Sequence, residues 1–247
     1  MPRFKLTIEY DGTEFVGWQR QDNGPSVQGA IEDAARGYCQ VDTVVHGAGR
    51  TDSGVHALGQ VAHVDLPRND PPDIVAKALN AHLRPLPIAI IGAEAVSDEF
   101  HARFSAIERG YEYRILNRRA HPTLNSNHVW WVGSSLNADA MNDAAQTLVG
   151  KHDFSTFRAA ECQSSSPVKT IDKITVARAG DNIFVSVRAR SFLHHQVRNI
   201  VGTLKYVGDG KWTKDDVQSA LEKRDRAAGG PTAPAAGLFL THVCYPD

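Results

Sequence analysis

The residues best suited to chemistry lie in the segment His46-Gly47-Ala48-Gly49-Arg50-Thr51-Asp52-Ser53-Gly54-Val55-His56-Ala57. Glycine permits backbone shapes and close approaches that other residues forbid, so this loop can place Asp52 directly against a ligand. A carboxylate in that position could act as a nucleophile, a general base or a metal ligand. The alternative is structural: Asp52 could close its own loop in an Asx-turn.

The surroundings of Asp52 disfavour a metal. No second carboxylate lies within reach of it in the segment. The nearby His46, His56 and His63 lack the i, i+4 spacing that a helical zinc site requires. The sequence therefore predicts no metal site here.

A second cluster spans Arg190 to Gly202, where we predict a helix from about Leu193 to Val207. The buried stripe of this helix would consist of Leu193, Val197, Ile200 and Val201. Helical spacing would bring His194, His195 and Arg198 close together. For the two histidines, a surface or satisfied core position is the alternative. Arg198 is set among apolar residues and requires a fixed partner, for which Asp52 is a candidate.

The elements that must position these residues follow from periodicity and turn signals. In residues 1–104 we predict strands at 4–10, 60–66 and 88–93, a helix after the N-cap Ser26, and a helix from Asp73 to Leu83. In residues 105–247 we predict strands at 111–116, 129–132, 170–177, 183–189 and 238–245. One helix there would run from the N-cap Asn137 to Gly150, and another from a capping box of Thr213 and Asp216 to about Lys223, in addition to the one at 193–207. The sequence therefore indicates two similar α+β halves, with residues 1–104 carrying the Asp52 loop.

Composition is that of an ordinary globular protein. Apolar residues make up 42% of the 247 residues and charged residues 22%. No apolar run approaches the length of a membrane span, and the N-terminus resembles a strand rather than a signal peptide. The three cysteines form no CxxC pair, which favours a reducing cytoplasm.

The net charge of the chain is −1, but positive charges are concentrated in two segments. Residues 182–208 contain no acid, and residues 101–121 contain five arginines against two glutamates. Such segments can form a local positive surface for a nucleic acid, or they can be ordinary solvated faces.

The segment Arg50 to Ala57 resembles the G-R-T-D-x-G-V-H-A signature of the TruA-type tRNA pseudouridine synthases. The resemblance continues in order through most of the chain, at residues 17–21, 26–28, 109–113, 150–154, 192–202 and 237–240. Two departures are small: Ser53 stands where the family often has alanine, and Gly110 where it often has a second basic residue. Neither position carries a reacting group.

The resemblance implies an isomerase that converts uridine to pseudouridine at positions 38 to 40 of the tRNA anticodon stem-loop, without a cofactor or metal. Asp52 matches the family's nucleophile, and Tyr111 matches the tyrosine that lies against the target base. Arg198 matches the partner of the aspartate, Leu238 part of the apolar wall, and Arg50 the residue that assists base flipping. The implied fold consists of two RRM-like or ferredoxin-like α+β halves with joined antiparallel sheets and a central cleft, which residues 105–247 would complete. The implied assembly is a cytoplasmic homodimer that binds one tRNA with both subunits.

The residues are compatible with these roles, because chemistry on a base requires a flipped nucleotide in a pocket with an apolar face. Tyr111 would supply that face, while Tyr113 is assigned to the core. Two alternatives come from other classes. A non-catalytic RRM-like RNA-binding module is opposed by the absence of the aromatic RNP motifs. A metal-dependent hydrolase using Asp52 is opposed by the missing ligand set.

Overall fold

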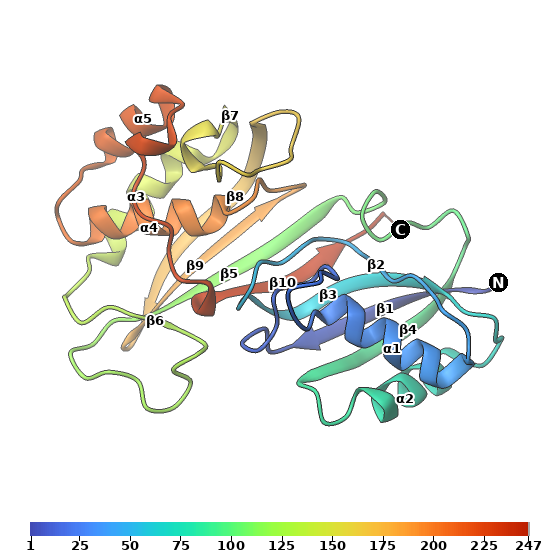
Figure 1. Cartoon of the computed structure of the whole chain (residues 1–247). Helices are drawn as coiled ribbons and strands as arrows, with labels where there is room; N and C mark the ends of the chain where they lie inside the picture. Colours follow the sequence, from blue (N-terminus) through green and yellow to red (C-terminus); the bar gives the residue numbers. More distant parts are fainter. Residues whose placement is uncertain (247) are drawn as a thin grey trace. The chain divides into compact units, whose positions relative to one another are not determined.

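The structure, a computed structural model, describes residues 1–246 and consists of two compact units (Figure 1). The first comprises residues 1–107 and 239–246, and the second comprises residues 108–238. The division expected from the sequence placed all of 105–247 in the second half. In the structure, strand β10 (Leu238–Cys244) pairs in parallel with β3 (His56–Asp65), so that Phe239 lies opposite His56. A pairing partner so distant in the chain leaves no local pattern from which it could be predicted.

The first unit is a sheet with two helices. Its strands follow the order β4-β1-β3-β10, where β1 (Arg3–Tyr10) pairs antiparallel with β3 and with β4 (Ile88–Val96). The short β2 (His46–Gly47) also pairs with β3. Helices α1 (Val27–Cys39) and α2 (Pro72–Leu83) lie next to each other along these strands (Figure 1).

Local sequence explains most of these elements. Alternate residues of β1 are buried, ending with Tyr10, which is 3% exposed. Helix α1 begins where Ser26 accepts a hydrogen bond from the Gly29 amide at 3.2 Å, the N-cap predicted from the sequence. Helix α2 differs: Pro72 opens it, and Asp73, the predicted cap, lies in the first turn. Proline suits this first position because it has no N–H group to leave unpaired.

The second unit is a sheet whose strands follow the order β5-β9-β8-β7. Its elements are β5 (Glu108–Leu116), β6 (Trp130–Trp131), α3 (Ala138–Ala145), β7 (Gly150–Asp153), β8 (Val168–Ala179), β9 (Asn182–Ala189), α4 (Gln196–Gly208) and α5 (Lys214–Lys223). The three helices gather on one side of the strands (Figure 1). The capping box of α5, formed by Thr213 and Asp216, is the one predicted.

Two predictions for the second unit are wrong. Strand β7 begins at Gly150, where only the end of a helix was expected. Helix α4 begins at Gln196 rather than at Leu193, so His194 and His195 precede the helix instead of lying on it. His195 has the left-handed backbone conformation (φ 61°), and the Gln196 side chain accepts a hydrogen bond from the Leu193 amide at 2.8 Å. This turn replaces the first helical turn that the apolar stripe suggested.

The α+β class is confirmed. Two pairings depart from the expected antiparallel arrangement, because β10 lies parallel to β3 and β6 lies parallel to β5. Within residues 1–246, no helix combines the length and the apolar character that crossing a membrane requires.

Candidate active site

The loop that carries Asp52 is fastened at its base to strand β3. The amide of Ala48 donates to the carbonyl of Val61 at 2.7 Å. The side-chain amide of Gln60, which is fully buried, donates to the carbonyl of Gly49 at 2.9 Å. The chain is therefore held by β3 just before it reaches Asp52.

Main-chain contacts also fix the tip of the loop. Gly17 forms an isolated β-bridge with Asp52, and the Trp18 amide donates to the Thr51 carbonyl at 3.0 Å. Gly17 has a φ of 119°, and a Cβ there would lie 2.7 Å from the Thr51 carbonyl oxygen, so no other residue fits without strain. The amide of Val55 donates to the Asp52 carbonyl at 3.1 Å and closes the turn. Backbone groups thus set the geometry of the loop, and the Asp52 side chain is half-buried.

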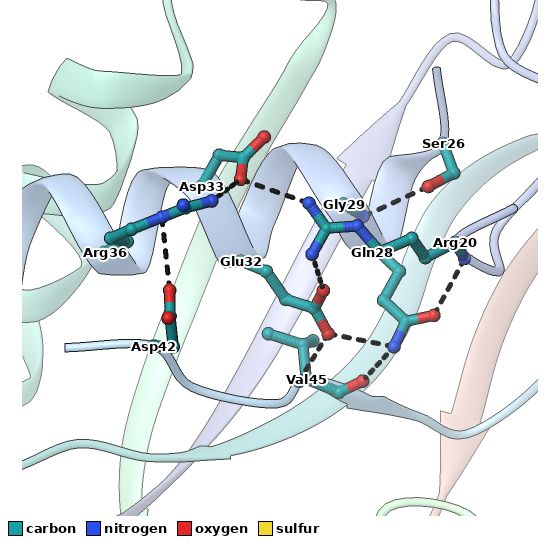
Figure 2. A network of polar contacts seen from close by, with 9 residues as sticks. All are labelled: Arg20, Ser26, Gln28, Gly29, Glu32, Asp33, Arg36, Asp42 and Val45. Carbon is teal, nitrogen blue, oxygen red and sulfur yellow. Dashed lines mark hydrogen bonds and ion pairs between the residues drawn. The ribbon is translucent and has the colours of Figure 1, made fainter. Parts of the chain in front are cut away.

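Segment 17–21, which contacts the loop, is itself held by helix α1 (Figure 2). The Glu32 carboxylate, which is buried, accepts from Arg20 at 3.0 Å, from Gln28 at 2.9 Å and from the Val45 amide at 3.1 Å. Gln28 also accepts from the Arg20 amide at 3.0 Å. A buried charge with this many partners is satisfied and fixes its neighbours firmly. The network therefore ties the segment of Arg20 and the approach to the Asp52 loop to one helix.

A buried hydrogen bond joins the end of β1 to the residue before Asp52. The Tyr10 hydroxyl lies 2.7 Å from the Thr51 hydroxyl, and both residues are buried. The Tyr10 ring packs 6.1 Å from that of Trp18, whose indole in turn leaves no room for a side chain at Gly47. The rings of Tyr10 and Trp18 thus pack against each other and against the Asp52 loop, at Thr51 and Gly47 respectively.

Tyr10→Phe is expected to lower the free energy of unfolding by about 1–2 kcal/mol, because it leaves the buried Thr51 hydroxyl without this partner. Thr51→Val should cost a similar amount. The double variant should be less destabilised than the sum of the two, since replacing both partners by apolar groups is nearly neutral. Urea unfolding of the four proteins measures this coupling, and strict additivity would show that the hydrogen bond contributes nothing.

His56, which ends the loop, is 1% exposed. Its ring stacks on Phe239 with the centroids 4.7 Å apart. Its Nδ1 atom lies 3.1 Å from both the Gly12 amide nitrogen and Asp11 Oδ1. Each tautomer permits only one of these two hydrogen bonds, and either one ties the loop to the turn that follows β1. His56 is therefore a structural support of the site.

His63 belongs to a stack of three histidine rings. Its centroid lies 4.8 Å from that of His46 and 4.7 Å from that of His101. The Nδ1 atom of His63 accepts from the Ala102 amide, and that of His101 accepts from the Arg103 amide, both at 3.1 Å. Burial, with the neighbouring charges of His101 and His46, lowers the pKa of His63 to about 4.

This depressed pKa predicts acid sensitivity. The unfolded chain binds a proton at His63 below about pH 6.5, whereas the folded chain resists it down to about pH 4. Stability should therefore be complete above pH 6.5 and fall by up to about 3 kcal/mol as the pH drops through this window. His101, whose pKa is lowered chiefly by burial, acts in the same direction.

His63→Gln offers the control, since a glutamine oxygen can still accept from the Ala102 amide. Its free energy of unfolding, measured in urea between pH 7.5 and pH 4.5, should fall less steeply with acid than that of the wild type. Equal slopes for the two proteins would show that His63 does not titrate in this way.

In the second unit, Tyr111 and Tyr113 project from β5 toward the side occupied by the helices. Tyr111 is half-buried and meets the ring of Phe192 edge to face at 5.2 Å. Tyr113 is fully buried, as predicted, and donates to the Pro234 carbonyl at 2.7 Å. Burial raises the pKa of the Tyr113 hydroxyl, and the positive charge of Arg198 acts in the opposite direction. Tyr111 therefore has the more accessible ring.

Arg198 is held on α4 by the loop that precedes β10. Its Nε donates to the Ala233 carbonyl at 2.8 Å, and the Ala233 amide donates to the Arg198 carbonyl at 3.1 Å. A Cβ at Gly202 would lie 1.7 Å from the Pro231 carbonyl oxygen, so the loop lies directly on the helix. The Arg198 side chain is half-buried, and its direction is set by these contacts.

Of the other predicted site residues, Arg50 is exposed beside Asp52, and Leu238 is 5% exposed at the start of β10. The first unit thus holds Arg50 and Asp52, and the second holds Tyr111, Arg198 and Leu238. Sequence reasoning missed the supports of the loop, which are Tyr10, Trp18, Glu32 and His56. Trp18 and His56 lie inside the motifs that carry the resemblance, and this was the only signal that pointed to them.

Known proteins are similar in sequence to this chain over most or all of its length. A family model described as tRNA pseudouridine synthase matches residues 6–105 and 144–246. The protein named tRNA pseudouridine synthase A of Rhodospirillum rubrum is 63% identical over 246 residues, which are 100% of this chain and 88% of the relative. The proteins of the same name from Paramagnetospirillum magneticum and Parvibaculum lavamentivorans are 60% and 59% identical over 245 residues, 99% of this chain and 96% and 100% of those relatives. A solved structure, "Crystal Structure of a Cbf5-Nop10-Gar1 Complex", aligns with 96% of this chain and 49% of that chain, at a TM-score of 0.42 and 10% identity.

Proposed function

Because this chain belongs to the tRNA pseudouridine synthase family, we propose that it modifies uridines 38 to 40 of the tRNA anticodon stem-loop with Asp52 as the nucleophile. Family membership itself makes the protein an isomerase that forms pseudouridine in tRNA. The observation that carries the proposal for Asp52 is the loop: main-chain contacts from two sides hold the backbone at Asp52 in place. A nucleophile benefits from such support, since its position is set before the substrate arrives.

The reaction balances without an external reactant. The bond between C1′ and N1 of the uridine breaks, the uracil turns within the site, and a bond from C1′ to C5 forms. C5 loses its proton and N1 gains one, so the product is an isomer of the substrate. The Asp52 carboxylate would attack either C6 of the base or C1′ of the sugar and leave unchanged at the end. No net oxidation occurs and no water is consumed, so the proposed chemistry requires neither a cofactor nor a metal.

We assign the remaining roles by the same resemblance. The half-buried ring of Tyr111 would lie against the target base and is a candidate for proton transfer. Arg198, fixed in direction by Ala233, would pair with the Asp52 carboxylate. Leu238 would contribute to the apolar wall, and the exposed Arg50 would fill the space left by the flipped base. In this proposal the second unit completes the catalytic cleft around the Asp52 loop.

The proposal includes a homodimer in which one tRNA contacts both subunits, working in the cytoplasm on its tRNA substrate. Support for this part comes from the family resemblance and from the cysteine pattern.

Release of tritium from tRNA labelled at uridine C5 tests the proposed function. Only isomerisation releases this label without cutting the chain, because C5 loses its hydrogen when it bonds to C1′. We expect release at no more than three sites, which sequencing of the product should place at positions 38 to 40. Binding without release would favour the RNA-binding module, and release accompanied by strand cleavage would favour a hydrolase.

A further inference from the structure

One face of the sheet in the second unit carries an unusual charge arrangement. Along β9, Ile183, Val185 and Val187 are buried on the side of the helices. The alternate residues, which include Arg188, point to the opposite face. Arg188 is exposed, and so is Arg190, one residue beyond the end of the strand.

A register shift places two positive charges side by side on this face. Ile171 of β8 pairs with Ala189, but the next paired residue is Lys173, which lies opposite Arg188. In a regular antiparallel ladder Asp172 would occupy that place, and the pair would attract. The bulge leaves Asp172 as its extra, unpaired residue and sets Lys173 opposite Arg188. Like charges directly opposite each other are destabilising.

No acid within residues 1–246 forms an ion pair with Lys173, Arg188 or Arg190. All three side chains are exposed. Arg114 on the neighbouring strand differs, because its Nε lies 2.8 Å from the Glu112 carboxylate. Among residues 1–246, Lys173, Arg188 and Arg190 thus have no ion-pair partner, whereas Arg114 has one in Glu112.

We propose that Lys173, Arg188 and Arg190 form a binding surface for the phosphates of the tRNA backbone. The proposal rests on the function above, since it names where that substrate is held. An arrangement that costs stability persists when it serves a function, and a phosphate between two cations removes their repulsion. Such contacts also release counterions from the RNA, so they favour a polyanion over a single small ion.

The inference predicts effects of opposite sign on stability and on binding. Lys173→Gln removes the repulsion with Arg188, so the thermal midpoint should stay the same or rise, while the affinity for tRNA falls several-fold. The slope of log affinity against log salt should become shallower by about 0.7 to 0.9 for each lost phosphate contact. Lys173→Glu should stabilise the fold further, because it would pair with Arg188, and it should bind tRNA more weakly still.

Lys223→Gln is the matched control: Lys223 is exposed near the end of α5, in the helix layer, and its loss changes the net charge equally. Its tRNA affinity and salt slope should equal those of the wild type. Filter binding of tRNA at four salt concentrations, with thermal unfolding of each protein, completes the test.

Wild-type affinity and slope in both Lys173→Gln and Lys173→Glu would overturn the inference while leaving the proposed function intact. So would an equal loss of affinity in Lys223→Gln, which would show a net-charge effect only. Absence of tritium release by the wild type would instead refute the proposed function.

Discussion

Asp52→Asn is expected to abolish pseudouridine formation, with a loss of at least about 10⁴-fold in the single-turnover rate, as is typical when a nucleophile is removed. The amide has nearly the shape of the carboxylate but cannot attack carbon. The loop should keep its conformation, because main-chain groups of Gly17, Trp18 and Val55 fix it. The affinity for tRNA should therefore stay within about threefold of the wild type, since phosphate contacts supply most of it.

Asp22→Asn is a suitable control, because Asp22 is exposed in the same unit and the substitution is the same. It should react at the ordinary rate. Mass spectrometry of the Asp52→Asn protein must confirm that the asparagine is intact. Ordinary turnover by the verified variant would exclude Asp52 as the nucleophile.

The second large effect is expected at Arg198. Arg198→Met should lose about 10²- to 10³-fold in single-turnover rate, the size typical of removing one preorganised charged partner. Arg198→Lys should keep a larger part of the activity, because the charge survives without the planar fork that fixes direction. Quenched-flow measurement with labelled tRNA at saturating enzyme separates these rates from binding.

Arg198 also holds the loop before β10 through Ala233, so a structural loss must be distinguished from a chemical one. Thr232→Val provides this control: the Thr232 hydroxyl bonds to Asn199 at 2.7 Å in the same loop, and its removal leaves the guanidinium in place. A rate loss in Thr232→Val as large as that in Arg198→Met would assign the effect to the loop. Near-normal rates in Arg198→Met would show that another group orients Asp52.

The sequence alone determined the features that depend on neighbours within a few residues. The alternation of β1, the Ser26 cap of α1 and the capping box at Thr213 are local, and the structure contains all three. The glycine-rich surroundings that single out Asp52 are local as well. Such features follow from helical and strand periodicity and from side chains that bond to their own backbone.

Only the tertiary structure decided what supports these residues. The hydrogen bond between Tyr10 and Thr51, the pairing of β10 with β3, and the bulge that sets Lys173 against Arg188 all join segments that are distant along the chain. Helix α4 also starts later than predicted. The Gln196 side chain and the left-handed backbone of His195 form a turn where periodicity predicted a helix. Local patterns record which face of an element is apolar, but each partner across a sheet is chosen by the packing of the whole unit. The pairing partner of a strand depends on the sum of many contacts between distant segments. The residues next to that strand in the sequence do not indicate which contacts these are.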